Sequence, residues 1–362
     1  MLRQLARLTR TVEGVGDRAL AIAVYADDGG HSFAAAETGY EGVACVDDAA
    51  RALVLTCDLW KATGFPLFRA WADGLLAFVI GMQDADGLFT NFIEDWSGRR
   101  NVRARTSLAG GEFWQARGLR GLASATLAFD DPLAEAGLRR GLARLDGVAA
   151  PSNVRAIHVR TAVELLRGGR LPSLRADLER WSDEIASCRR GDVLFDDPDQ
   201  DGPHLWGHLQ EGALAEAGAY LERANLVAVA RRSAGAYLAP VIESGFDLPV
   251  VQPYGVACAL YGVGRLATVT GDPMLHALAP RARAWFDGRN PARRPVYDRS
   301  AGSVHDGIDG GRLNMHSGAE SNVEGALALF DEVAGSAASR VPLVQACFPQ
   351  AVRERLDRSP GT

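Results

Sequence analysis

Apolar residues recur along most of the chain at helical spacing, and runs in which every second residue is apolar are rare. Alanine, leucine and arginine fill the interiors of the periodic segments. Glycine and proline mark the breaks between segments, for example at Gly64 with Pro66 and at Asp131 with Pro132. The pattern therefore predicts an all-α protein.

We expect twelve helices from this pattern, one for each periodic segment. They lie near 14–26, 47–63, 66–83, 111–128, 131–146, 152–167, 171–188, 205–221, 223–243, 254–270, 273–287 and 320–333. Links from an even-numbered helix to the next odd-numbered helix are short, whereas most of the other links are long and polar. The long links cover 27–46, 84–110, 189–204 and 289–319.

Helices joined in this alternating way predict six helical hairpins closed into an (α/α)6 toroid. The odd-numbered helices would form an outer ring and the even-numbered helices an inner ring. The long loops and the N-termini of the inner helices would then share one face, where a ligand cleft is expected. We expect a single toroid domain over residues 1–340 and a C-terminal tail over 341–362. An irregular helical solenoid or a pair of bundles stays open as the alternative.

The composition, with 47% apolar and 23% charged residues, is that of a soluble globular protein. A net charge of −6 and the lack of a basic run argue against nucleic acid as a partner. No segment reaches the about 20 apolar residues that cross a bilayer, and residues 1–18 lack the apolar stretch of a secretion signal. The five cysteines are scattered without CxxC spacing, which indicates reduced thiols and a cytoplasmic protein.

The helix predicted at 47–63 begins with two acids, Asp47 and Asp48, and has Arg51 one turn later. One aspartate can cap the helix, and Asp47 can pair with Arg51 across one turn. Two adjacent acids with an arginine nearby also fit a site that binds hydroxyl groups and holds a charged general base. Both interpretations stay open.

Acids and tryptophans occur together in the second long link and in the helix that follows it. The link carries Asp95 and Trp96, and the helix begins with Glu112 and Trp114. Aromatic faces stack on sugar rings and carboxylates accept hydroxyl protons, so this combination favours a carbohydrate ligand. Glu112 would lie in the first turn of an inner helix, where it either offsets the helix dipole or acts on a ligand.

His204, His208 and Glu211 are spaced so that one face of a helix over 205–221 would carry all three. This spacing is typical of metal ligands, but the glutamate of an HExxH motif is absent. The acidic segment before them, 196–201, fits either a solvated loop or a cation site. We favour contacts with a polar substrate over a metal site.

The last long loop, 304–321, is rich in glycine and polar residues and leads straight into the helix predicted at 320–333. Long loops of this kind are often functional. Its candidate residues include Asp306, His316 and Glu320, although the histidine also fits a surface position and the glycine–aspartate pairs fit ordinary turns.

Four segments stand out together: Cys45–Leu53, Asp86–Phe92, Gly111–Arg117 and Asn314–Ser321. In these segments the chain resembles a bacterial family of the six-hairpin glycosidase-like superfamily, which is associated with glycosyltransferases and mannoside-processing enzymes. The resemblance implies a six-hairpin toroid and a carbohydrate setting. Around Glu112 and at His208 and Glu211 the chain departs from the family pattern, so the resemblance implies no particular reaction.

We expect a carbohydrate-active enzyme, first of all a glycoside hydrolase that acts on an oligosaccharide or glycoside. Such an enzyme uses two carboxyl groups, about 5–5.5 Å apart if it retains the anomeric configuration and about 6.5–9.5 Å apart if it inverts it. The candidates for the catalytic pair are Asp48, Glu112, Asp306 and Glu320. The residues expected to hold the sugar are Asp47, Arg51, Asp95, Trp96, Trp114, Trp206, His208, Glu211, Gln252, Tyr254, Asn314 and His316. We expect neither a metal nor a cofactor.

Two other functions fit the same fold. A sugar epimerase or isomerase would use histidines as proton carriers, and His208 with His316 is the natural pair. A non-catalytic glycan-binding protein would bind sugar without turnover. Fold alone does not choose among the three, because chemistry depends on the site.

Overall fold

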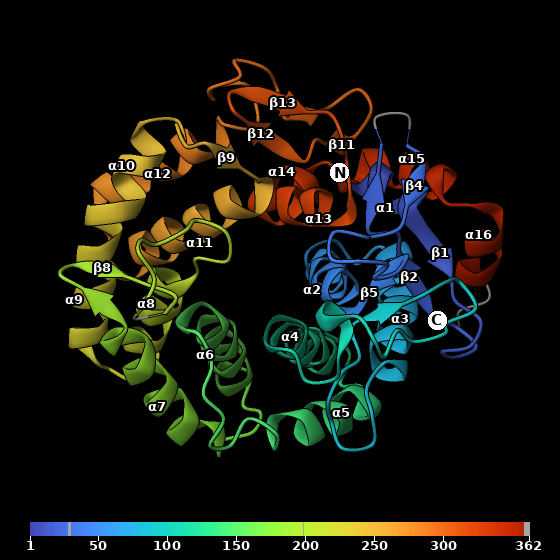
Figure 1. Ribbon diagram of the computed structural model, residues 1–362, viewed down its shortest axis with the longest axis horizontal. Coiled ribbons are helices and arrows are strands. Elements are labelled where there is room, and N and C mark those ends of the chain that lie inside the picture. The colour runs from blue at the N-terminus through green and yellow to red at the C-terminus, as the bar shows by residue number, and fades with distance from the viewer. Residues whose placement is uncertain (28–29, 198, 358–362) are drawn as a thin grey trace. The chain divides into compact units, whose positions relative to one another are not determined.

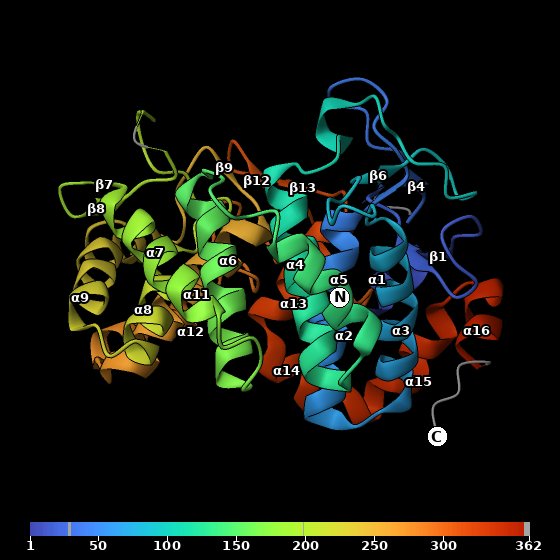
Figure 2. The same cartoon turned by 90° about the horizontal axis from the view of Figure 1, so that it is seen from below.

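Helices carry most of the chain, with short strands between them, in the computed structural model of residues 1–27, 30–197 and 199–357 (Figures 1 and 2). The contacts among these residues divide the chain into two units. Unit 1 comprises Met1–Val148, Asp298–His305 and Met315–Thr362, and unit 2 comprises Ala149–Tyr297 and Asp306–Asn314.

Unit 1 is built from paired helices, short strands and a C-terminal group of helices. Its helices are α1 (Leu2–Leu8), α2 (Val46–Thr63), α3 (Pro66–Gly81), the short 3-10 helix η1 (Arg105–Ser107), α4 (Glu112–Phe129), α5 (Pro132–Leu142), α13 (Ala319–Ala328), α14 (Phe330–Gly335), α15 (Ala337–Cys347) and α16 (Gln350–Asp357). Its strands are β1 (Thr9–Thr11), β2 (Leu20–Ile22), β3 (Tyr25–Ala26), β4 (Ser32–Phe33), β5 (Ala44–Cys45), β6 (Phe92–Ile93) and β11 (Ser303–Val304).

Helix α2 is central to unit 1, because it packs against α3, α4 and α13 (Figure 1). Small residues allow α2 and α4 to approach closely: a Cβ atom added at Gly121 would lie 3.2 Å from Ala50. Helix α5 packs against α4 in turn. The helices predicted at 47–63, 111–128 and 320–333 are therefore observed, although the last one is broken at Leu329 into α13 and α14.

The helix predicted at 14–26 is absent, and this prediction is wrong. Strands β1 and β2 pair there as an antiparallel hairpin, and residues 14–18 lie in the turn. Every residue from 19 to 24 is buried, so the apolar run belongs to a strand covered on both faces and not to one face of a helix. Gly14 fits against the backbone of Ser97, where an added Cβ atom would lie 2.3 Å from the carbonyl oxygen.

The C-terminal helices pack onto unit 1. Helix α15 contacts α1, and α16 contacts α3 and β1. The guanidinium of Arg355 on α16 donates a hydrogen bond to the carbonyl of Ala19 at 3.0 Å. Residues 358–362 of the tail expected at 341–362 lie outside the described residues, and the division of the chain at residue 340 stays a prediction.

Unit 2 repeats the pairing of helices. Its helices are α6 (Ser152–Arg167), α7 (Leu174–Ser187), α8 (Gln210–Tyr220), α9 (Ala224–Ser233), the π-helix η2 (Ala234–Leu238), α10 (Ala239–Glu243), α11 (Pro253–Thr270) and α12 (Pro273–Arg283). Its strands are β7 (Arg189–Arg190), β8 (Val193–Leu194), β9 (Val250–Val251), β12 (Gly307–Asp309) and β13 (Arg312–Asn314), and β10 (Tyr297–Asp298) lies where the chain passes from unit 2 to unit 1.

Helix α8 packs against α6 and α11, and each of these three helices also packs against the helix that follows it in the chain. The helix predicted at 205–221 begins only at Gln210. Gly207 has a φ angle of 76°, in the left-handed region that favours glycine, and the chain turns there before the helix. His204 and His208 therefore precede α8, and the expected common helix face with Glu211 is wrong.

Part of the last long loop forms a β-hairpin in unit 2. Strands β12 and β13 pair around Gly310 and Gly311, whose φ angles are both positive, and β12 also pairs with β9. Positive φ at two successive residues is the geometry of a tight hairpin turn. The loop residues that follow the hairpin, from Met315 onward, belong to unit 1.

Among the described residues, no helix is both long enough and apolar enough to cross a membrane.

Candidate functional site

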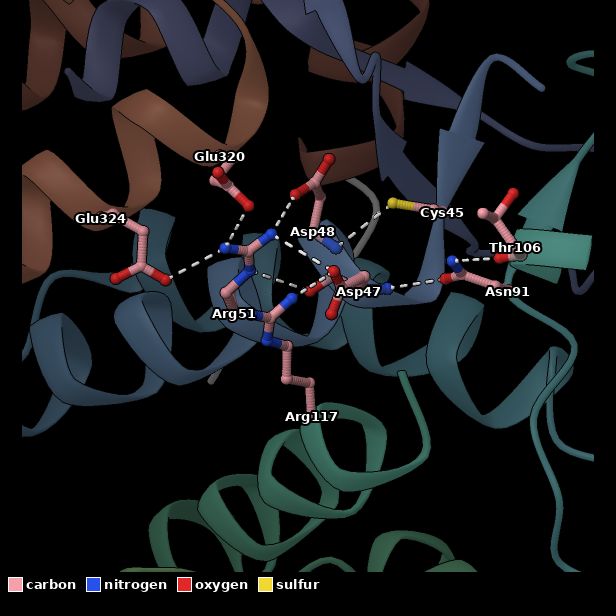
Figure 3. Close-up of polar contacts among 9 residues, drawn as sticks. All are labelled: Cys45, Asp47, Asp48, Arg51, Asn91, Thr106, Arg117, Glu320 and Glu324. Atoms are coloured by element: carbon pink, nitrogen blue, oxygen red, sulfur yellow. Dashed lines mark hydrogen bonds and ion pairs between the residues drawn. The ribbon is translucent and has the colours of Figure 1, made fainter. Parts of the chain in front are cut away.

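Arg51 is the centre of a buried group of charged side chains in unit 1 (Figure 3). Its Nη2 donates to Asp48 at 2.7 Å, and its Nη1 donates to Glu320 at 3.0 Å and to Glu324 at 3.2 Å. A carboxylate oxygen of Asp47 lies 3.5 Å from Nη2. The acids come from α2 and α13, so the fold brings together Asp48 and Glu320, two of the four carboxyl groups that the sequence offers for the catalytic pair.

Arg117 adds a third helix, α4, to this group. Its Nη1 donates to Oδ2 of Asp47, and its side chain is almost fully buried. Asp47 thus pairs with Arg51 from its own helix and with Arg117 from the neighbouring helix α4. We define the Arg51 cluster as Asp47, Asp48, Arg51, Arg117, Glu320 and Glu324.

Cys45 and Asn91 fix the start of α2. The Sγ of Cys45 accepts a hydrogen bond from the backbone N–H of Asp48 at 3.4 Å, and the Oδ1 of Asn91 accepts one from the backbone N–H of Asp47 at 3.2 Å. These bonds satisfy amide groups that have no partner inside the helix. The first turn of α2 is therefore anchored, and its carboxylates stay at the positive end of the helix dipole.

The carboxylates of the Arg51 cluster outnumber its two arginines, and burial together with the nearby charges decides which groups hold a proton. Burial raises the pKa of Asp48 to about 7 against the opposing charge of Arg51, and burial also raises the pKa of Glu324. Burial acts in the same direction on Asp47, but Arg117 and Arg51 outweigh it and hold the pKa of Asp47 below its ordinary value. Near neutral pH, Asp48 can therefore exchange a proton next to a carboxylate that stays ionised.

Glu320 is the carboxylate through which the Arg51 cluster opens to solvent. The exposed fraction of its side chain is 29%, compared with 19% for Asp47 and 4% for Asp48. One oxygen of Asp48 binds Arg51, and the other points away from it (Figure 3). His316, four residues before Glu320, is also exposed. Of the four acids in the Arg51 cluster, Glu320 therefore has the most exposed side chain.

Glu112 and Trp114 lie at the start of α4. Glu112 is exposed in the first turn. The indole of Trp114 covers Gly111, and its N–H donates to the carbonyls of Phe89 at 3.0 Å and Leu108 at 3.1 Å. Trp114 therefore links the start of α4 to the loop that precedes it.

Asp95 and Trp96 lie in the loop after β6. Asp95 pairs with Arg99 at 2.6 Å, and the carbonyl of Trp96 accepts a hydrogen bond from the N–H of Glu13. The structure thus joins this loop to the turn between β1 and β2.

Unit 2 contains a second buried polar group, centred on His208. The Nε2 of His208 lies 2.9 Å from Oε1 of Glu211, and the hydroxyl of Ser233 donates to the same oxygen at 2.6 Å. Burial favours the neutral imidazole, but the charge and hydrogen bond of Glu211 together with the charge of Asp196 outweigh burial and raise the pKa of His208. The side chains of His208 and Glu211 have no exposed surface.

Asp196 extends this buried group toward the surface. It is 2% exposed, accepts a hydrogen bond from Gln210 at 2.7 Å, and lies 2.9 Å from the ring of His204, which is half exposed. The bond to Asp196 raises the pKa of His204. We define the His208 cluster as Asp196, His208, Gln210, Glu211 and Ser233. Pro198, in the neighbouring acidic segment, lies outside the described residues.

The remaining candidates also belong to unit 2. The rings of Trp206 and Tyr254 meet edge to face with centroids 5.3 Å apart, and Tyr254 is buried. Gln252 is exposed at the residue before α11. Asp306 is half-buried before β12, and Asn314 is exposed at the end of β13. In the described part of the chain, no group of three or more His, Cys, Asp or Glu residues has an arrangement that holds a metal ion.

Two members of the Arg51 cluster are absent from the residues selected by sequence. Glu324 lies four residues after Glu320 on α13, so helical spacing alone places both acids on one face. Arg117 lies within the segment Gly111–Arg117 that carries the family resemblance. The spacing could have identified Glu324, whereas the pairing of Arg117 with Asp47 depends on how α4 packs against α2.

No protein-family model matches the chain by sequence, and no curated protein does so either. Solved structures do match it. A D-mannose isomerase matches with a TM-score of 0.69 and 9% identity over 91% of this chain and 95% of the isomerase. The cellobiose 2-epimerase of Spirochaeta thermophila matches with a TM-score of 0.63 and 14% identity over 90% of each chain. A family 76 α-mannanase of Bacteroides thetaiotaomicron matches with a TM-score of 0.56 and 11% identity over 83% of this chain and 88% of the mannanase.

These similarities establish the fold. The chain has the all-α, (α/α)6 fold of six helical hairpins that is found in the six-hairpin glycosidase-like superfamily, which confirms the fold expected from the sequence. The similar structures include both hydrolases and sugar epimerases or isomerases. At such low sequence identity, the shared fold does not establish which reaction the protein catalyses.

Proposed function

We propose that the protein is a carbohydrate-active enzyme, and specifically a glycoside hydrolase whose catalytic carboxyl groups are Asp48 and Glu320. The observation that carries this proposal is the sharing of Arg51: one guanidinium binds a buried acid from α2 and a solvent-accessible acid from α13. The two acids differ in environment, and such a difference assigns the roles of acid and base in hydrolases.

Asp48 is the proton donor in this proposal. Burial raises its pKa to about 7, so a substantial fraction of Asp48 holds a proton near neutral pH. The oxygen that points away from Arg51 would donate this proton to the oxygen of the departing sugar. A general acid works best when its pKa lies near the working pH.

Glu320 is the nucleophile in this proposal. Its contact with Arg51 stabilises the carboxylate, and its 29% exposure leaves it accessible to a sugar. Carboxylates that bind adjacent nitrogen atoms of one guanidinium stand close together, which supports the shorter separation of a retaining enzyme. Glu320 would attack the anomeric carbon as Asp48 protonates the leaving oxygen. A water molecule, deprotonated by Asp48, would then release the sugar from Glu320.

Asp47 and Arg117 support this pair electrostatically. The two arginines keep Asp47 ionised, and its negative charge stands next to Asp48. A like charge nearby favours the protonated form of Asp48. Asp47 would thus favour the transfer of a proton from water to Asp48 in the second step.

The test is a screen of manno-, gluco- and glucurono-oligosaccharides in which new reducing ends are measured. We expect the wild-type protein to produce new reducing ends from at least one class of oligosaccharide, and Glu320→Gln to produce none. Full activity of Glu320→Gln would remove Glu320 from the mechanism. Retention is checked by proton NMR, which records whether the first anomer released has the configuration of the substrate.

A sugar epimerase or isomerase is the second candidate, and the His208–Glu211 pair favours it. An imidazole whose pKa is raised by a carboxylate can carry a proton, as this chemistry requires. His208 is fully buried, so in this conformation it does not meet a substrate from solvent. An epimerase would change the sugar without creating a new reducing end.

A further inference from the structure

Three aromatic rings lie together beside the Arg51 cluster. The ring of Phe33 on β4 lies 5.6 Å from the ring of Tyr25 on β3 and 5.5 Å from the ring of His316, measured between centroids. His316 meets Phe33 edge to face, and Tyr25 is tilted against it. We call Tyr25, Phe33 and His316 the aromatic group.

The backbone holds the aromatic group next to Glu320. The N–H of Ala319 donates to the carbonyl of Val24 at 2.8 Å, and the N–H of Ser317 donates to the carbonyl of Ala26 at 3.0 Å. Gly318 lies between them, and a Cβ atom added there would lie 2.7 Å from the carbonyl oxygen of Val24. Strand β3 therefore lies directly against the residues that lead into Glu320.

Tyr25 is anchored on the inner side of the aromatic group. It packs against the buried residues Val24, Ala35, Cys45 and Phe92, and Cys45 caps α2 immediately before the acids of the Arg51 cluster. Burial, then the bond to Glu37, then the charges of Asp48 and Glu320 raise the pKa of Tyr25 above its ordinary value. The charges of both proposed catalytic acids therefore act on the side chain of Tyr25.

Phe33 forms the outer side of the group and remains 42% exposed. The hydroxyl of Tyr25 donates to Oε1 of Glu37 at 2.7 Å, which orients an exposed carboxylate near the rings. An exposed ring with a fixed carboxylate nearby offers an apolar face and a hydrogen-bond acceptor. Packing of the hairpin by itself requires neither the exposure of Phe33 nor a carboxylate oriented by Tyr25.

We propose that Phe33, supported by Tyr25 and His316 and accompanied by Glu37, is a stacking subsite for a pyranose ring of the substrate next to Glu320. This inference rests on the proposed function. The C–H bonds on one face of a pyranose are polarised by the adjacent oxygens and contact the negative face of an aromatic ring. The hydroxyl groups at the rim of the same sugar donate to a carboxylate. The ligand class is therefore a neutral sugar ring with one face free of axial hydroxyl groups.

The test measures binding of cellobiose, β-1,4-mannobiose and methyl β-glucoside to the full chain by isothermal titration calorimetry. Phe33→Leu keeps an apolar side chain but removes the ring, and Phe33→Trp keeps a ring. The subsite predicts that Phe33→Leu weakens binding about 3- to 10-fold, whereas Phe33→Trp retains it. Leu133→Ala on α5 removes another exposed apolar side chain of unit 1 and is expected to bind as the wild type does.

Circular dichroism and thermal melting of each variant show whether the fold persists, and Phe33→Trp supplies a second readout if Phe33→Leu does not fold. Equal affinity of Phe33→Leu and wild type overturns the subsite, as does a wild type that binds none of the three sugars. Loss of binding by Phe33→Trp also overturns it, because the ring and not the residue identity is proposed to matter.

The subsite and the proposed function fail in different ways. Sugar binding that depends on Phe33, without any product, leaves the subsite in place and overturns the hydrolase. Turnover with a KM that Phe33→Leu does not raise leaves the hydrolase in place and overturns the subsite. Glu320→Gln is expected to bind the same sugars while it loses turnover, which separates stacking from chemistry.

Discussion

The Arg51 cluster and the His208 cluster are built from similar groups but differ in their access to solvent. Each joins a buried cation or imidazole to carboxylates, and each perturbs the pKa of at least one member. In the Arg51 cluster the side chain of Glu320 is 29% exposed, whereas in the His208 cluster the side chains of His208 and Glu211 have no exposed surface. A perturbed pKa marks a candidate site, but a ligand also needs a group that it can reach.

The partners inside the clusters differ as well. Arg51 binds carboxylates from two helices that are far apart in sequence, so the cluster fixes α2 against α13. Glu211 is shared by His208 and by Ser233 at the end of α9, so the His208 cluster fixes α9 against the start of α8. We therefore expect chemistry from the first cluster and mainly stability from the second.

The largest effect is expected from Glu320→Gln. The substitution removes the accessible charge and should reduce kcat by about 10²- to 10⁴-fold, the range typical of a lost acid or base. Steady-state kinetics on a substrate found by the oligosaccharide screen provides the measurement. Glu332 lies on α14 and forms a surface pair with Arg299, so Glu332→Gln is the matched control and should leave kcat unchanged. Equal kcat for the two variants contradicts the assignment.

Arg51→Met should lower the free energy of unfolding by about 3–5 kcal/mol, because it leaves buried carboxylates without their cation. Urea unfolding followed by circular dichroism measures the change. Arg139→Met breaks an exposed pair with Glu135 on α5 and should cost about 0.5 kcal/mol or less. If both variants are equally stable, Arg51 does not organise the cluster.

Glu211→Gln tests the role of the buried His208 cluster. Loss of a charged acceptor shared by His208 and Ser233 should lower the free energy of unfolding by about 1.5–3 kcal/mol. At a temperature where the variant is folded, kcat should equal that of the wild type. Glu243→Gln, in an exposed pair with Arg281, is the control for stability. A large fall in kcat without loss of stability would move the chemistry to the His208 cluster.

The smallest effect, for each unit of pH, is a difference in pH dependence between wild type and Asp48→Asn. The pKa of Asp48 is raised from 3.8 to about 7 in the folded protein. Between these values the folded state holds a proton that the unfolded state releases, so stability falls as pH rises through this window and levels off above it. The proton on Asp48 changes the free energy of unfolding by at most about 1.4 kcal/mol per pH unit. Unfolding free energies at pH 5, 6, 7 and 8 should therefore decline less in Asp48→Asn, and parallel curves argue against a proton on Asp48.

The sequence predicts those helices whose ends depend on local signals. The helix at 152–167 has the predicted bounds, and α2 ends at Gly64 in the left-handed conformation that such a break requires. The segment 14–26 fails because its apolar run fits a helix or a covered strand equally well, and only the pairing of β1 with β2 decides between them. Periodicity does not contain that long-range information.

The candidate site shows the same limit. Asp47, Asp48 and Arg51 are recognisable from their spacing on one helix. The contact of Arg51 with Glu320 joins residues 269 positions apart, and no local pattern specifies it. The aromatic group likewise depends on the backbone bonds between β3 and the residues before α13. Gly207 displaces His208 from the helix that its spacing predicts, so a pattern that suggested a common helix face does not form one.

The most direct test of the central claim is mass spectrometry of the products formed in D₂O by the wild-type protein, after the hydroxyl groups are exchanged back in H₂O. Hydrolysis at the Arg51 cluster predicts shorter sugars without carbon-bound deuterium, and no such products from Glu320→Gln. A sugar of unchanged length that carries one carbon-bound deuterium would contradict the account. It would show that the protein transfers a proton at a carbon atom of the sugar, as an epimerase or isomerase does.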